Sequence, residues 1–175
     1  MTIQVHWTYI VKFAVCFVCF FTRTIYHVLG HKRHKIAEHK SMPLLIGINM
    51  FLLWFSWFSM NFSDPLRIAL PLWLKILGLV LFVVGTVLVI ISHIHIPGYG
   101  TSELRTTGVY SKIRHPMYFG FMLWLVGFPL FLQSIMTLIT AVLWVPAFVS
   151  WQILEEKQLV EKFPAYREYI EKTWF

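Results

Sequence analysis

Long apolar runs separated by short basic gaps are the feature that most restricts how this chain can fold. The longest run, residues 117–154, carries no charged side chain, and three earlier blocks carry very few. About 20 consecutive apolar residues are enough for an α-helix to cross the hydrocarbon core of a bilayer. Of the 175 residues, 58% are hydrophobic and only 13% are charged, which argues against a soluble globule. The sequence therefore predicts an all-α, polytopic membrane helical bundle that forms a single domain over residues 1–175.

The uncharged run is too long for one membrane span and about long enough for two. We expect a tight helical hairpin that turns near Gln133 and Ser134. Gly120 and Gly127 would allow the two arms of this hairpin to approach closely. The first apolar block lacks the basic leading segment of a secretory signal, so we expect it to be retained as a span. The five predicted spans are residues 7–26, 43–62, 71–92, 117–132 and 135–154.

Lys and Arg side chains gather in every second gap between the predicted spans. The stretch between Thr22 and Ser41 holds five of them, residues 93–116 hold three and residues 155–175 hold four, whereas the gap before the third span holds only Arg67. Basic loops mark the cytoplasmic side of a membrane protein. We therefore predict an integral, multi-pass protein with an outside N-terminus and a cytoplasmic C-terminus, in the bacterial inner (plasma) membrane or in the endoplasmic reticulum of a eukaryote.

The basic gaps also indicate what the protein contacts. The net charge of +7 is confined to them, which is typical of contact with anionic headgroups of the lipid bilayer and argues against a nucleic-acid partner. The tail, residues 155–175, is charged and helix-prone, and it carries apolar residues at spacings that give one amphipathic face on the cytoplasmic side. These apolar residues are Leu159, Phe163, Tyr166 and Ile170.

The longest polar interval lies between two very apolar blocks and ends at Tyr118. Gly108 permits the positive φ of a tight turn, and Pro116 favours a helix that starts there. Arg114 and His115 then lie at the start of a helix, where free N–H groups suit a carboxylate or another anionic group. The same residues could equally form a basic collar at the lipid headgroups. The spacing alone leaves both interpretations open.

A family resemblance favours the first interpretation. Tyr110 with the run Arg114-His115-Pro116-Met117-Tyr118, followed by Glu155-Glu156 and the tail from Phe163 to Tyr169, resembles the isoprenylcysteine carboxyl methyltransferase and phospholipid methyltransferase superfamily. The resemblance covers about the last 80 residues. It implies an integral-membrane enzyme that moves a methyl group from S-adenosylmethionine to a lipophilic small molecule or a lipid-modified acceptor, with residues 93–175 as the cofactor-binding half.

The resemblance also assigns roles to individual residues. It implies that Glu155 or Glu156 holds the amino group of S-adenosylmethionine, and that Ser102, Leu104 and Arg105 align with the segment ahead of the turn. A carboxylate acceptor needs a cation to bring it out of water, and Arg114 or Arg105 is the nearest candidate. An amine acceptor must lose a proton, which would give a glutamate such as Glu155 a base-like role. The other implied cofactor-lining residues are Tyr110, His115, Pro116, Met117 and Tyr118.

One departure from the superfamily pattern leaves the acceptor open. Members that methylate a prenylated cysteine usually carry an arginine four residues before the glutamate, and this chain has Trp151 there if Glu155 is the equivalent residue. The run Gly98-Tyr99-Gly100 is similar to a glycine motif of the phospholipid N-methyltransferase branch, although a lone Gly-x-Gly is a weak signal. The sequence therefore does not decide between O-methylation and N-methylation.

Two other functions stay open. His27, His31 and His34, with His93 and His95 in the later gap, are similar to the histidine clusters of membrane metal oxidases and hydroxylases. Such centres need many imidazole ligands, and the chain has only eight histidines, so we do not expect a metal. The second alternative is a non-catalytic membrane protein that retains the fold.

Overall fold

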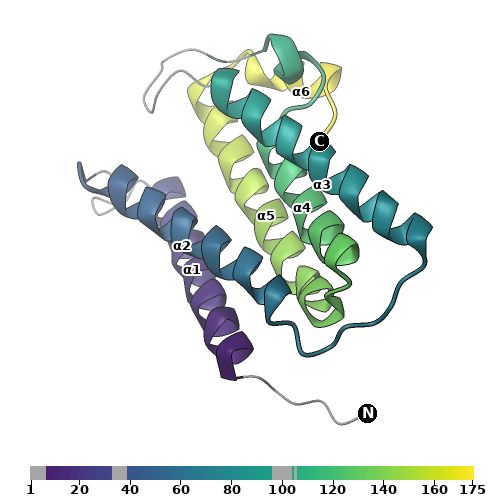
Figure 1. Ribbon diagram of the computed structural model, residues 1–175. Helices are drawn as coiled ribbons and strands as arrows, with labels where there is room; N and C mark the ends of the chain where they lie inside the picture. Colours follow the sequence, from purple (N-terminus) through teal and green to yellow (C-terminus); the bar gives the residue numbers. More distant parts are fainter. Residues whose placement is uncertain (1–6, 33–38, 96–103, 105) are drawn as a thin grey trace.

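Five long helices of alternating direction build the protein, and a sixth, short helix lies at one end (Figure 1). The computed structural model describes residues 7–32, 39–95, 104 and 106–175. The helices are α1 (Trp7–His31), α2 (Met42–Phe62), α3 (Leu72–His95), α4 (Pro116–Leu132), α5 (Ile135–Lys162) and α6 (Tyr166–Lys172), and a 3-10 turn, η1 (Gly108–Ser111), precedes α4.

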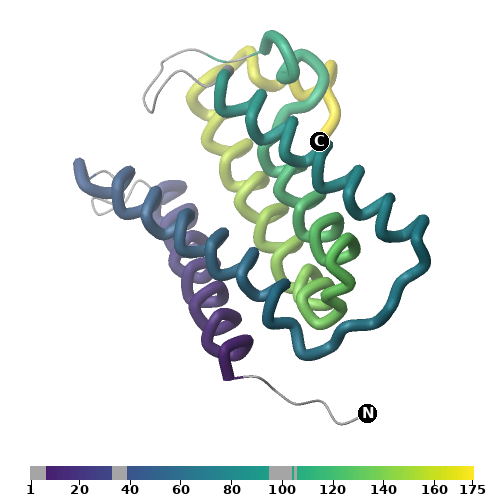
Figure 2. The backbone as a smooth tube through the Cα atoms, in the orientation of Figure 1, coloured from purple at the N-terminus to yellow at the C-terminus, as the bar shows by residue number. Residues whose placement is uncertain are grey.

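The alternating directions, which the smooth trace of Figure 2 makes easy to follow, give the molecule two distinct ends. We call the end where α1, α3 and α5 finish, and where α6 lies, the tail end (Figure 1). The opposite end holds residues 63–71 and the turn at Gln133 and Ser134, and we call it the turn end. The described parts of the three basic stretches therefore share the tail end.

The helix lengths confirm a multi-pass membrane fold. Four helices, α1, α2, α3 and α5, are long and apolar enough to cross a bilayer. The fifth, α4, has 17 residues, which corresponds to about 26 Å and is near the lower limit for a span. α1 and α5 continue past the predicted span ends at residues 26 and 154, to His31 and Lys162. The predicted spans end where a polar stretch begins, but a polar stretch limits the apolar segment and does not end the helix.

The glycines of α4 serve a different interface from the predicted one. Gly120 and Gly127 face α3 and not α5: a Cβ on Gly127 would lie 2.6 Å from the main-chain nitrogen of Phe82, and one on Gly120 would lie 2.7 Å from the carbonyl oxygen of Gly85. Gly78 meets Gly127 in the same way. Residues seven apart lie on one helix face, and this face points to α3. The expectation that these glycines close the α4–α5 hairpin was wrong.

Aromatic side chains fill the space between α1, α2, α4 and α5. Phe20 stacks on Trp144 with ring centroids 4.3 Å apart, and Trp54 contacts Phe121 at 4.7 Å. Phe148 is fully buried among them. Large apolar side chains on the outer faces of α2 and α3 remain exposed, as expected for helices that meet lipid.

Polar contacts close the turn end. Asp64 is buried, and its carboxylate accepts hydrogen bonds from the main-chain N–H of Leu66 (2.8 Å) and from both the N–H and the hydroxyl of Thr137 (2.7 Å each). Gln133 has a φ of 61°, which forms the predicted turn between α4 and α5. The Ser134 hydroxyl donates to the carbonyl of Asn61 (2.8 Å). The α2–α3 loop and the hairpin turn are therefore held as one unit.

Candidate functional site

The predicted turn and helix start are present at the tail end. Gly108 has a φ of 63°, and α4 begins at the fully buried Pro116. The main-chain N–H groups of Arg114 and His115 donate to the main-chain oxygen of Phe175, at 2.9 and 3.1 Å. Both N–H groups ahead of α4, where we expected an anionic group, are thus paired with the end of the tail.

Glu156 connects three segments of the tail end. Its Oε1 accepts a hydrogen bond from Arg114 Nε at 2.9 Å and lies 3.0 Å from His115 Nε2. Arg114 Nη1 also donates to the carbonyl oxygens of Thr173 (2.6 Å) and Ile170 (3.2 Å). Arg114 therefore holds α5, the start of α4 and the tail together, and Glu156 is the anion at the centre of that contact.

Glu155 points to a different partner. Its Oε2 accepts a hydrogen bond from the hydroxyl of Tyr118, at 2.8 Å, and Tyr118 is buried. No other hydrogen bond from the described residues reaches this carboxylate. Tyr110 lies against Ser92 and close to Glu155; burial raises the pKa of its phenol, and the nearby carboxylate raises it further. Adjacent glutamates thus differ, because Glu156 is paired with two basic side chains and Glu155 with one phenol.

The tail covers this site in two pieces. Phe163 has an extended backbone ahead of Pro164, which ends α5 and breaks the continuous amphipathic face that the spacing predicts. α6 instead buries Tyr166 and Tyr169. The Tyr169 hydroxyl donates to the main-chain oxygen of Tyr110, and burial raises the pKa of Tyr169 to about 12. The tail therefore packs directly on the segment that the resemblance assigns to the cofactor.

The first helix brings residues to the site that the sequence did not indicate. The Arg23 guanidinium lies beside the Tyr118 hydroxyl and 6.0 Å from the ring centre of Trp151. The His27 ring stacks on Trp151 at 5.4 Å, and the Trp151 indole N–H donates to the Thr24 hydroxyl oxygen at 2.9 Å. The sequence shows Arg23, Thr24 and His27 as polar residues on one part of an apolar helix. Nothing in the sequence indicates that they meet Trp151.

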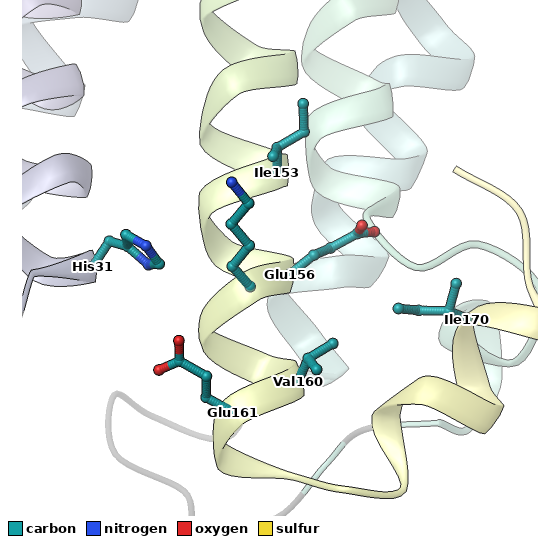
Figure 3. A pocket seen from close by; sticks show the side chains of 7 residues that line it. His31, Ile153, Glu156, Val160, Glu161 and Ile170 are labelled. Carbon is teal, nitrogen blue, oxygen red and sulfur yellow. The ribbon is translucent and has the colours of Figure 1, made fainter.

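An open hollow of about 500 Å³ lies next to this cluster (Figure 3). His31 of α1 and Glu156 of α5 line it, together with the apolar side chains of Ile153, Val160 and Ile170. Figure 3 shows His31 pointing from α1 toward α5, and Glu156 pointing from α5 toward the start of α4. The hollow thus lies between α1, α5 and α6.

Some of the predicted site residues are not seen at the tail-end cluster. Ser102, Arg105 and the run Gly98-Tyr99-Gly100 lie outside the described residues, as does His34. Leu104 is half-buried, and Met117 packs against the aromatic core. Within the described ranges no group of three or more His, Cys, Asp or Glu side chains could hold a metal ion, so the metal oxidase alternative is not favoured.

Comparisons with known proteins agree with the resemblance. A family model described as phospholipid methyltransferase matches residues 73–166, which is more than half of the chain. The chain belongs to the phospholipid methyltransferase family. It is also similar to the protein-S-isoprenylcysteine O-methyltransferase of Saccharomyces cerevisiae, with 45% identity over 69 residues that make up 39% of this chain and 28% of the relative. No solved structure matches the chain.

The family match covers only part of the tail-end cluster. Residues 73–166 include His115, Tyr118, Glu155 and Glu156. They do not include α1, so Arg23 lies outside the segment that the family model matches, whereas its neighbours Tyr118 and Trp151 lie within it. The chain also spans much less than two thirds of its yeast relative.

Proposed function

We propose that this protein is an integral-membrane methyltransferase that transfers a methyl group from S-adenosylmethionine to a lipophilic acceptor. The observation that carries the proposal is the Glu155 carboxylate, which is bound to Tyr118 on one oxygen within the family-matched segment. The neighbouring Glu156 is already paired with Arg114 and His115. Glu155 is therefore the glutamate that can accept a ligand cation without losing a salt bridge.

The residues at the tail end fit S-adenosylmethionine. An ammonium group needs an anionic acceptor at hydrogen-bonding distance, and Glu155 supplies one with an oxygen to spare among the described residues. Tyr110 and Tyr118 provide aromatic surface beside it, and His115 lies next to Tyr118, with ring centroids 5.7 Å apart. When bound, S-adenosylmethionine supplies an electrophilic methyl group on a positively charged sulfur.

The chain's own residues contribute binding, orientation and exclusion of water. Methyl transfer from a sulfonium to an anionic oxygen removes charge, so a dry pocket that aligns the reactants favours it. The buried Tyr166 and Tyr169 of α6 exclude water on one side. Arg114 acts as a positioning residue in this proposal, because it ties the tail to Glu156. A carboxylate acceptor needs no general base at neutral pH.

The arrangement of the ends suggests how the two substrates arrive. We place the tail end in the cytoplasm, because the basic stretches gather there. A soluble cofactor then enters from the cytoplasm, and a lipophilic acceptor reaches the same end laterally from the bilayer. This division of access gives a methyltransferase a reason to span the membrane.

Calorimetric titration of the detergent-purified protein with S-adenosylhomocysteine tests the proposal. We expect saturable binding by the wild type. Glu155→Gln should weaken it by about 1–3 kcal/mol, which is roughly five- to 150-fold, through loss of a charge-assisted hydrogen bond. A folded wild-type protein that does not bind S-adenosylhomocysteine would contradict the proposed function.

A further inference from the structure

We propose that Arg23 and His27 of α1 form a subsite for an oxyanion on the lipophilic acceptor, an inference that rests on the proposed methyltransferase function. The subsite lies between α1 and the α4–α5 pair, next to Trp151. Its ligand chemistry is a carboxylate or phosphate oxygen attached to a lipophilic molecule. It is separate from the glutamates that carry the proposed cofactor contacts.

Buried nitrogen atoms without partners on α1 are the first observation. Arg23 Nε, His27 Nε2 and His31 Nδ1 are all buried and have no hydrogen-bond partner among the described residues. Leaving such a group unpaired costs about 1–3 kcal/mol, so buried polar groups are normally satisfied. The three residues are four apart and therefore follow one face of the helix. That face turns toward α5, since His27 stacks on Trp151 and His31 points to α5 (Figure 3).

The second observation is how firmly the surroundings of Arg23 are fixed. Trp151 is fully buried, and its indole N–H is bound to Thr24 of α1. The His27 ring stacks on one part of this indole, with an angle of 16° between the planes, and Arg23 lies at 6.0 Å from its centre. The guanidinium and the imidazole are thus held on a rigid aromatic surface. A fixed cation of this kind loses little side-chain freedom when it binds a ligand.

The third observation is the position of the pair relative to the cofactor contacts. Tyr118 lies between them, because its hydroxyl donates to Glu155 and has Arg23 beside it. An anion on Arg23 would therefore be one side chain away from a cation on Glu155. A guanidinium repels an ammonium and binds an oxyanion through two parallel hydrogen bonds. The two charges divide the site into a part for the cofactor cation and a part for the acceptor anion.

The hollow beside α1 accounts for the apolar part of such an acceptor. His31, the last residue of the unpaired row, lines it. Ile153, Val160 and Ile170 form the apolar part of its wall, and Glu156, Lys157 and Glu161 form the charged part. The row therefore runs from Tyr118 to the wall of an open space between α1 and α5. An acceptor with an oxyanion and a hydrocarbon chain matches both features.

Binding measurements on the full chain in nanodiscs, with S-adenosylhomocysteine present, test the inference. The first probe pair is N-acetyl-S-farnesylcysteine and its methyl ester, which differ only in the charge of the carboxyl group. We expect the wild type to bind the acid at least about tenfold more tightly, which is 1.4 kcal/mol, and Arg23→Gln to bring the ratio close to one. Lys32→Gln is the matched control, because Lys32 is an exposed cation one residue beyond α1.

A second arm distinguishes the two sources of oxyanion. Phosphatidylglycerol is added to nanodiscs of phosphatidylcholine, and its binding to wild type and Arg23→Gln is compared. Loss of the acid preference in Arg23→Gln identifies a carboxylate ligand, and loss of phosphatidylglycerol binding alone identifies a phosphate ligand. If Arg23→Gln changes neither, the inference is overturned. If Arg23→Gln does not fold, the same comparison is made with Arg23→Met, which also removes the charge but keeps a long side chain, and an unchanged result there overturns the inference. Unaltered S-adenosylhomocysteine binding in these variants shows that the proposed function survives.

Discussion

The two ends of the protein differ in how completely their buried polar atoms are paired. At the turn end, the Asp64 carboxylate accepts three hydrogen bonds of 2.8 Å or less, and Arg67 donates to the carbonyls of Asn61 and Leu132. At the tail end, Arg114 and Glu156 are paired as well, but Arg23 Nε and His27 Nε2 are buried and have no hydrogen-bond partner among the described residues. The turn end still leaves neutral atoms unpaired, such as Asn61 Oδ1. The difference teaches that paired polar atoms hold the scaffold together, and it supports our proposal that the unpaired nitrogens of α1 meet a ligand.

The largest expected loss of stability comes from a substitution at the turn end. Asp64→Ala removes the acceptor for Leu66 and Thr137 and leaves their N–H groups buried and unpaired, so it should lower the free energy of unfolding by about 3–5 kcal/mol. Thermal unfolding in detergent measures this change. The fraction that remains folded should bind S-adenosylhomocysteine as the wild type does. If Asp64→Ala had normal stability but bound S-adenosylhomocysteine more weakly, the turn end would contribute to binding and not to the scaffold, contrary to our interpretation.

A smaller loss of stability should come from the α3–α4 contact. Gly127→Ala places a methyl group 2.6 Å from the main chain of α3, where no flexible side chain can move away, and should cost about 1–3 kcal/mol. Gly47→Ala is the matched control, because a Cβ there meets nothing within 4 Å. It should leave stability unchanged or raise it slightly, since alanine favours helix over glycine. Equal effects of the two changes would show that α3 and α4 do not approach as closely as described.

The smallest expected effect separates the two glutamates at the tail end. Glu156→Gln breaks the pairs with Arg114 and His115 and should reduce stability by about 1–2 kcal/mol, because both carboxylate contacts are only partly buried. Its effect on S-adenosylhomocysteine affinity should be well below that of Glu155→Gln. Glu168→Gln on α6 is the control, since its carboxylate is exposed and pairs only with Lys172. If Glu156→Gln weakens binding more than Glu155→Gln does, our assignment of the two carboxylates is wrong.

The sequence predicted local features of the site well. Gly108 and Pro116 fix the turn and the helix start because each restricts the backbone at its own position, so both were readable without a structure. The resemblance also points to the pair Glu155-Glu156, whose role in cofactor binding stays a prediction. Which glutamate meets Arg114 was not, because neighbouring helix residues point about 100° apart and the partner belongs to another helix.

Contacts between distant segments account for what the sequence missed. Arg23 and Trp151 meet only because α1 packs on α5, and no local pattern reports a pairing over such a separation. The helix predicted to contact Gly120 and Gly127 was wrong for the same reason. Their spacing places them on one face of α4, but it does not say which helix that face meets. The sequence predicts a span that ends at residue 154 and a helix-prone tail after it, and α5 continues through both to Lys162 because Glu155 and Glu156 find partners on α4 and ahead of it.

The glycine contact between α3 and α4 sets the distance between these two helices. Gly78 and Gly85 on one helix face Gly127 and Gly120 on the other, and the backbones meet where a methyl group would overlap main-chain atoms. Any larger residue at one of these four positions must therefore push the helices apart. Because α4 begins at Pro116, next to His115 and Tyr118, the spacing of the two helices also sets where the start of the candidate site lies.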